Sequence, residues 1–337
     1  MPEYSIPYPW QQNTWQAFLR RYEQGRIPHA ALLSGQQGMG KRHLANTMAN
    51  LLLCQQPKSG LPCGTCRACV LIQSESHPDK IHISPEEGAR QIKIDQIRSL
   101  SAFVGETAQQ GGNKVVVLGP LEALNINAAN ALLKNLEEPT PGTYFMVFSH
   151  ILSAAMATIR SRCQIVPLGV PTREQSIQWL SLANTDKHKD LALYLDFAAG
   201  APLLAKRLLS DENENLKVFI KTLVTISKTI GVDLSIIQNW LDIDLSDLLN
   251  WWLHLIYLWI MIQTRKNQDY DKVGTIGRQV YDLADLNYNK QWLFRFSDKL
   301  MALKRQVLQG ANHNRQLLLE ELLLDWCAIM KAATTHP

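Results

Sequence analysis

The sequence contains no apolar stretch long enough to cross a membrane. Its most apolar run, WWLHLIYLWIMI at residues 251–262, has only twelve residues and includes His254, whereas a membrane helix needs about 20. We therefore interpret this run as a buried helix. The N-terminal MPEYSIPYPW also lacks the basic segment followed by an apolar stretch that marks a secretory signal. We expect a cytoplasmic protein.

The chain also lacks an excess of charge of either sign. Its 34 basic and 30 acidic residues leave a net charge of +4, which does not indicate a dedicated nucleic-acid binder. There is no internal repeat and no low-complexity segment. A length of 337 residues with 46% hydrophobic content predicts two or three domains, each with its own core.

The first half of the chain alternates short apolar runs with amphipathic helical patterns. This alternation is typical of an α/β domain with a parallel sheet covered by helices. One such helix is expected at NAANALLKNLEEP, with Asn127 as its N-cap and Pro139 as its stop. The strands are expected at residues 29–35, 80–84, 114–119, 143–149 and 163–168.

The pattern changes after Pro167. Residues 168–207 predict a small helical unit, and from residue 208 strand signals give way to long helices rich in leucine and tryptophan. We therefore expect three domains with boundaries at 1–167, 168–207 and 208–337. The tryptophans of the apolar run are expected in the core or at an interface rather than stacked on bases: Trp251, Trp252 and Trp259.

Four of the six cysteines lie close together in the spacing C-x8-C-x2-C-x2-C. This spacing suits one tetrahedral ion, and in a reducing compartment it indicates a metal rather than disulfides. Four sulfurs leave no open position, so a structural zinc site is expected. The alternative is four unrelated buried thiols, which poorly explains cysteines three residues apart. The proposed ligands are Cys54, Cys63, Cys66 and Cys69.

The cysteine stretch is a weak candidate for a DNA-binding module. Residues 54–69 contain no aromatic side chain and only Lys58 and Arg67 as cations, which leaves little to bind phosphate or stack bases. The other two cysteines, Cys163 and Cys327, are interpreted as core residues.

The stretch GQQGMGKR at residues 35–42 has the spacing of a phosphate-binding loop. Glycines let such a loop turn its backbone N–H groups toward a phosphate, and Lys41 could reach the β and γ oxygens. Arg42, however, stands where a serine or threonine would bind magnesium, and a guanidinium cannot coordinate a metal. The glycines of the loop are Gly35, Gly38 and Gly40.

A second feature of an ATPase is missing from KVVVLGPLEAL. Hydrolysis needs an acidic residue at the end of this strand to hold magnesium, and commonly a second carboxylate to activate water. Gly119 and Pro120 occupy those positions, and Glu122 stands two residues further on. We expect no hydrolysis. The loop is then either a structural turn or a nucleotide site without turnover.

The helix NAANALLKNLEEP, the later SRC motif and the four-cysteine insertion together resemble the clamp-loader branch of the AAA+ ATPases. The similarity covers the whole chain, is strongest over residues 29–163 and is weakest in the last third. It implies an AAA+ nucleotide-binding domain with a zinc module at 54–69, a small helical lid, and a helical collar that joins five subunits in a ring.

The resemblance also implies a role. It is that of a rigid, non-hydrolysing stator that helps load a sliding clamp onto primed DNA within a bacterial replicative polymerase holoenzyme. Its implied partners are motor subunits of the gamma/tau type, a clamp-opening delta subunit, the sliding clamp, and DNA through the assembled complex. Leu203 stands near the position of a sensor arginine, while Lys41 is kept. The alternative is an ATP-hydrolysing motor subunit, which would carry a hydroxyl residue after Lys41 and an acidic pair after the strand.

The SRC motif, residues 161–163, implies that Arg162 is an arginine finger directed at ATP on a neighbouring subunit. A planar, permanently charged group stabilises charge on the transferring phosphoryl group. The competing interpretation is a surface arginine paired with a carboxylate, a description that could also fit Arg160.

Overall fold

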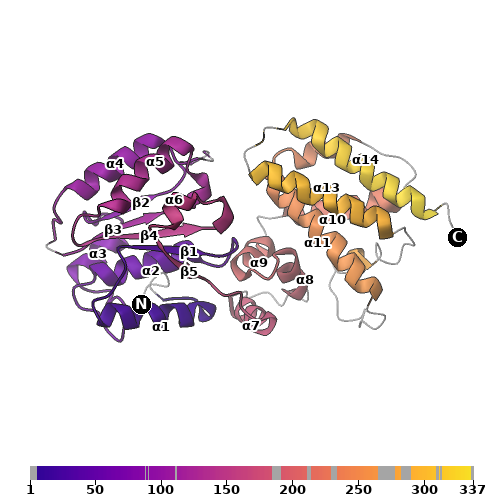
Figure 1. Ribbon diagram of the computed structural model, residues 1–337. Helices are drawn as coiled ribbons and strands as arrows, with labels where there is room; N and C mark the ends of the chain where they lie inside the picture. The colour runs from indigo at the N-terminus through magenta and orange to yellow at the C-terminus, as the bar shows by residue number, and fades with distance from the viewer. Residues whose placement is uncertain are drawn as a thin grey trace. The chain divides into compact units, whose positions relative to one another are not determined.

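The computed structural model describes residues 6–87, 89, 91–110, 112–183, 191–210, 214–228, 234–264, 278–281, 290–308, 311 and 313–334. The chain forms two compact units, Met1–Pro171 and Thr172–Pro337, shown in Figure 1. The expected division of the second unit into a lid and a collar stays a prediction.

The first unit is built on a five-stranded sheet in the order β2-β3-β4-β1-β5. Every neighbouring pair is parallel, so the carboxyl ends of all strands meet at one edge. β1 and β3 are buried along their whole length, as the continuous apolar runs predicted. The strands are β1 (Ala30–Ser34), β2 (Lys80–Ile83), β3 (Lys114–Leu118), β4 (Thr143–Ser149) and β5 (Gln164–Pro167). All five predicted strands, and the α/β fold class, are confirmed.

Helices cover both faces of this sheet. Figure 1 shows α4 (Ile94–Gly105) and α5 (Ile126–Glu137) on one face and α2 (Lys41–Leu53) on the other. Buried residues of α4 and α5 form one core with alternate residues of the strands. The remaining elements are η2 (Pro9–Gln11), α1 (Gln12–Glu23), α3 (Arg67–Gln73), η3 (Leu121–Ala123), η4 (Leu152–Ala154) and α6 (Ala157–Arg160).

The start of α5 corrects one prediction. Asn125, not Asn127, is the N-cap: its backbone is extended and its side-chain oxygen accepts a hydrogen bond from the N–H of Ala128 at 2.8 Å. Asn127 is an exposed residue inside the first turn. Asparagine caps well only with a non-helical backbone, and of the two asparagines only Asn125 has one.

The end of α4 is held by a buried lysine. Lys114 is 4% exposed, and its ammonium donates to the carbonyl oxygens of Phe103 at 2.5 Å and Glu106 at 2.8 Å. The Phe103 carbonyl lies in the last turn of α4, where it also accepts a long hydrogen bond from the N–H of Glu106 at 3.4 Å, and Glu106 is the C-cap residue of the helix. The ammonium also lies 4.3 Å from the centroid of the Phe103 ring. Lys114 therefore joins β3 to α4.

Within the described residues of the second unit, every regular element is a helix. Leu203, which stands near the expected sensor position, lies in α9 (Pro202–Leu209). The described helices are α7 (Arg173–Ala183), α8 (Leu191–Phe197), α9 (Pro202–Leu209), α10 (Glu214–Lys228), η5 (Leu234–Trp240), α11 (Leu245–Thr264), α13 (Lys290–Leu308) and α14 (Arg315–Thr334). None of the helices within the described ranges has the length and apolar character needed to span a membrane.

Aromatic side chains dominate the core of this unit. The Phe219 ring lies 5.3 Å, centroid to centroid, from both Trp240 and Trp252. Trp251, Trp252 and Trp259 are at most 3% exposed, so of the two predicted locations, core or interface, all three occupy the core. Cys327 belongs to this core and Cys163 to that of the first unit, also as predicted.

Candidate functional site

The predicted phosphate loop lies between β1 and α2, at the carboxyl edge of the sheet. Its glycines Gly35, Gly38 and Gly40 have φ values of +150°, +81° and +78°, a region that favours glycine. Gly40 is the N-cap residue of α2. The backbone therefore turns at the three positions where the sequence supplies glycine.

The ammonium group of Lys41 is bonded to the loop itself. The side chain is only 2% exposed, and its ammonium donates to the carbonyl oxygens of Gly35 at 2.5 Å and Gln36 at 2.6 Å. Burial lowers the pKa of Lys41 to about 8, partly opposed by the negative charge of Glu122. A phosphate would have to draw the ammonium away from these two carbonyls.

A segment at the start of the chain, here called the strap (residues 6–11), is tied to the end of the loop. The Trp10 indole N–H donates to the carbonyl of Met39 at 3.1 Å. The Gln11 amide donates to Met39 at 2.9 Å and to Gly40 at 3.0 Å. These contacts join residues 28 or 29 positions apart, and no local sequence pattern predicted them.

Aromatic stacking completes the strap. The rings of Tyr8 and Trp10 lie 4.9 Å apart and nearly parallel, at 6°. The Tyr8 ring is so close to Gly40 that a Cβ added there would lie 2.8 Å from it. Gly40 is therefore required both for its positive φ and for this approach.

The structure explains why an acidic residue is missing after β3. Gly119 has a φ of +149°, and a Cβ added to it would lie 2.6 Å from the carbonyl oxygen of Phe148. That distance is far below van der Waals contact, so no side chain fits at this position. Arg42, where a magnesium ligand would stand, is exposed in the first turn of α2.

Glu122 is already engaged by the end of β4. It lies in η3, and its carboxylate accepts hydrogen bonds from the Ser149 hydroxyl at 3.0 Å and from the backbone N–H of His150 at 2.7 Å. Burial, and then the charge of Lys41, lower the pKa of His150 to about 4. The carboxylate thus holds two loops together and is not placed as a free base toward water.

Arg162 lies between α6 and β5, where it forms an ion pair with Glu137 of α5. One guanidinium nitrogen also donates to the carbonyl of Thr158 at 2.8 Å. The side chain is 34% exposed and that of Glu137 is 47% exposed. Among the described residues, none accepts a hydrogen bond from the buried Nε of Arg160. The carboxylate partner anticipated for a surface arginine therefore belongs to Arg162.

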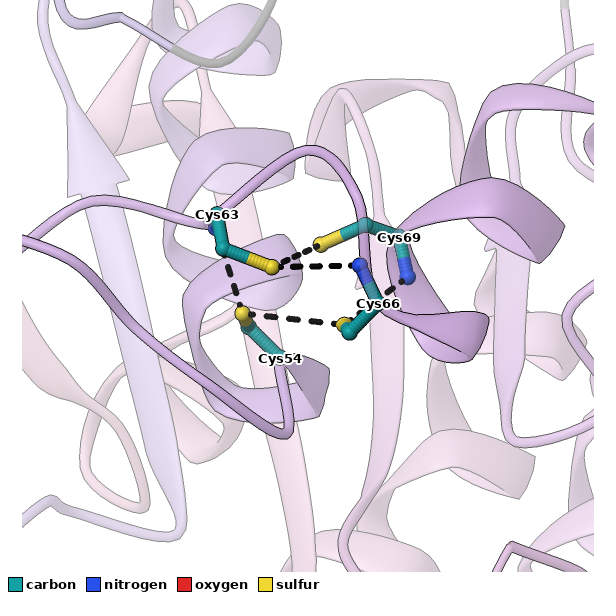
Figure 2. A group of neighbouring side chains, drawn as sticks. All are labelled: Cys54, Cys63, Cys66 and Cys69. Carbon is teal, nitrogen blue, oxygen red and sulfur yellow. Dashed lines mark hydrogen bonds between the residues drawn. The ribbon is translucent and has the colours of Figure 1, made fainter.

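The four cysteines converge on one point, as Figure 2 shows. Their sulfur atoms all lie within 4.8 Å of one another, and all four are free thiols. The Cys54–Cys66 and Cys63–Cys69 sulfur distances are both 3.9 Å. A tetrahedral zinc with bonds of about 2.3 Å requires sulfur–sulfur separations of about 3.8 Å. The cluster therefore fits a tetrahedral metal ion.

Backbone N–H groups point at these sulfurs. The N–H of Cys63 donates to the sulfur of Cys54 at 3.3 Å, that of Cys66 to Cys63 at 3.2 Å, and that of Cys69 to Cys66 at 3.5 Å. Hydrogen bonding, led by the N–H of Thr65, lowers the pKa of Cys63 to about 6. Burial raises the pKa of Cys54 and Cys69. Donors of this kind stabilise thiolates, which are the metal-binding form.

Comparison with known proteins gives the family. A family model described as DNA polymerase III, delta subunit, matches residues 10–171. DNA polymerase III subunit delta' of Pseudomonas aeruginosa is 36% identical over 96% of this chain and 98% of its own length. That of Yersinia pestis is 30% identical over 97% of each chain.

A solved structure of a DNA polymerase III gamma subunit-related protein from Thermotoga maritima covers 94% of this chain and 99% of its own, with a TM-score of 0.46 and 18% identity. The family is shown by the two long alignments to delta' subunits. The chain therefore belongs to the DNA polymerase III delta' family.

Proposed function

We propose that this chain is a non-hydrolysing stator subunit of the DNA polymerase III clamp loader. In this role it helps load the sliding clamp onto primed DNA and lends Arg162 to ATP bound by a neighbouring motor subunit. Family membership supports a place in the clamp loader, because the long-matching relatives are named as delta' subunits of this polymerase.

The observation that best supports the non-hydrolysing role is the lack of space for a side chain at Gly119. A Cβ there would meet the Phe148 carbonyl at 2.6 Å, so the magnesium-binding acid of a motor subunit has no room. Arg42 removes the second magnesium ligand, and Glu122 is bound to Ser149 and His150. Metal-assisted phosphoryl transfer needs these groups. The same features count against the alternative of an ATP-hydrolysing motor subunit.

The surroundings of Arg162 suit a group that acts on another subunit. Its pair with Glu137 is solvent-accessible on both sides, and exposed pairs contribute only about 0–1 kcal/mol. Exchanging Glu137 for the more highly charged phosphoryl oxygens therefore costs little. An arginine supplied in trans accelerates phosphoryl transfer by about 10³ to 10⁵.

The four cysteines are proposed to hold structural zinc. All four ligands are sulfur, which leaves no position for water or substrate. The chain's proposed partners are gamma/tau-type motor subunits, the delta subunit and the sliding clamp, with DNA contacted through the assembly. Residues 168–207 and 208–337 are proposed as the lid and the collar. Replication of the bacterial chromosome places the protein in the cytoplasm.

The role of Arg162 is tested by replacing it with alanine in a reconstituted clamp loader. DNA-stimulated ATP turnover should fall sharply, because the motor site that receives the guanidinium loses its charge stabilisation. Arg98→Ala is the matched control, since Arg98 is also an exposed arginine paired with a carboxylate, Asp95, in the same unit. Equal turnover in the two variants and the wild type would remove the proposed role.

A further inference from the structure

Two helices of the first unit begin at the phosphate loop. α2 starts with Lys41 itself, and α1 follows directly on the strap whose Gln11 is bonded to Gly40. With 13 and 12 residues, these helices are about 20 and 18 Å long at 1.5 Å per residue. A change at the far end of either helix can therefore reach the loop through a stiff element.

The far ends of both helices meet the cysteine loop. Cys54 is the C-cap residue of α2. The tip of the loop packs closely against α1. A Cβ added to Gly60 would lie 2.8 Å from a methyl carbon of Leu19, a side chain that is only 8% exposed. The cysteine loop thus contacts α1 on one side and continues α2 on the other.

α2 is fixed to the sheet without any metal. The Asn113 amide donates to the carbonyl of Leu52 at 2.9 Å, and the Lys80 ammonium donates to the side chain of Asn50 at 2.9 Å. The last turn of α2 is therefore an anchored point. The cysteine loop connects the end of α1 to that point.

The cysteine loop has little regular structure of its own. Between Cys54 and the start of α3, all of which the structure describes, the one regular feature is a bridge between Lys58 and Leu61. Gly60 and Ser59, at its tip, both have positive φ. Loops of this kind take their fold from the bound metal. The position of Gly60 against Leu19 then depends on the four sulfurs being held together.

We propose that the cysteine module is a brace for the phosphate loop. When a metal holds the cysteines together, the loop tip fixes the C-terminal half of α1 against the anchored end of α2, and α1 in turn holds the strap on Met39 and Gly40. This inference rests on the metal proposed above and gives it a task inside the chain, distinct from binding DNA or a partner.

Hydrogen exchange measured by mass spectrometry on the full-length chain, with zinc and after chelation, tests the brace. Removing zinc should speed exchange in α1, the strap and residues 35–41, as well as in residues 54–69. In the last two turns of α1 the expected change is about tenfold, which corresponds to about 1.4 kcal/mol. Faster exchange confined to residues 54–69 would overturn the proposal.

Gly60→Ala separates the brace from metal binding, because it pushes the loop off Leu19 and leaves all four cysteines in place. It should speed exchange in α1 by a similar factor while the chain still carries one zinc ion by elemental analysis. Gly169→Ala is the matched control, since its added Cβ would meet nothing within 4 Å. A zinc-loaded Gly60→Ala variant with unchanged exchange in α1 would refute the brace alone, whereas a wild-type chain that binds no zinc would refute the proposed cofactor.

Discussion

Replacing Gly119 with aspartate puts an acid where a motor ATPase would carry one, and the structure predicts that the chain will not accept it. The new Cβ would lie 2.6 Å from the Phe148 carbonyl oxygen and 3.0 Å from the Phe148 ring. Overpacking of this kind costs about 1–3 kcal/mol. A non-glycine residue at a φ of +149° adds about 1 kcal/mol, the low end of the range for sparsely populated backbone regions. We expect a total loss of about 2–4 kcal/mol.

Thermal and urea denaturation measure this loss. For a unit of this size each kcal/mol shifts the melting temperature by about 2–4 °C, so Gly119→Asp should melt roughly 5–15 °C below the wild type. Gly169→Asp serves as the control, because a Cβ at Gly169 meets nothing within 4 Å. The double variant Arg42→Thr, Gly119→Asp should still not hydrolyse ATP. A wild-type melting temperature for Gly119→Asp, or ATP turnover by the double variant, would refute the reasoning.

Three further predictions concern stability and metal content. Lys114→Met should cost about 2–3 kcal/mol in urea denaturation, because the carbonyls of Phe103 and Glu106 lose a charged donor; an unchanged midpoint would contradict this. Cys63→Ser should lose the zinc that elemental analysis finds in Cys327→Ala, and equal zinc in both would argue against the site. Burial, followed by the charge of Arg42, lowers the pKa of His82 to about 4. In the unfolded chain the histidine has a pKa near 6.5, so between pH 6.5 and 4 it is protonated there and neutral in the folded chain. The free energy of unfolding therefore falls as the pH drops through this window. Between pH 7.5 and 5.0 the free energy of unfolding should therefore fall by on the order of 1 kcal/mol less in His82→Asn than in the wild type. Equal falls in the two proteins would contradict the assignment to His82.

Local patterns were sufficient to predict the sheet and the phosphate loop. The strands predicted at residues 114–119 and 143–149 appear as Lys114–Leu118 and Thr143–Ser149, because buried parallel strands need continuous apolar runs. The backbone of the loop has positive φ at all three predicted glycines, Gly35, Gly38 and Gly40. The cysteine spacing likewise brought the four sulfurs within 4.8 Å of one another.

Features that depend on distant residues could not be predicted in this way. The pair between Arg162 and Glu137 joins two elements whose separation depends on the packing of α5 and α6. The lack of space for a side chain at Gly119 depends on the carbonyl of Phe148 in the next strand of the sheet. The cap at Asn125 was missed by two residues because both asparagines suit an N-cap by composition, and backbone conformation decides between them.

ATP hydrolysis by the purified chain alone, and by the motor subunits with and without it, tests the central claim most directly. We expect no turnover above background for the chain alone at any magnesium concentration, and a marked rise in DNA-stimulated turnover when it joins the motor subunits. Hydrolysis by the isolated chain, or motor subunits that turn over ATP equally well without it, would contradict the account.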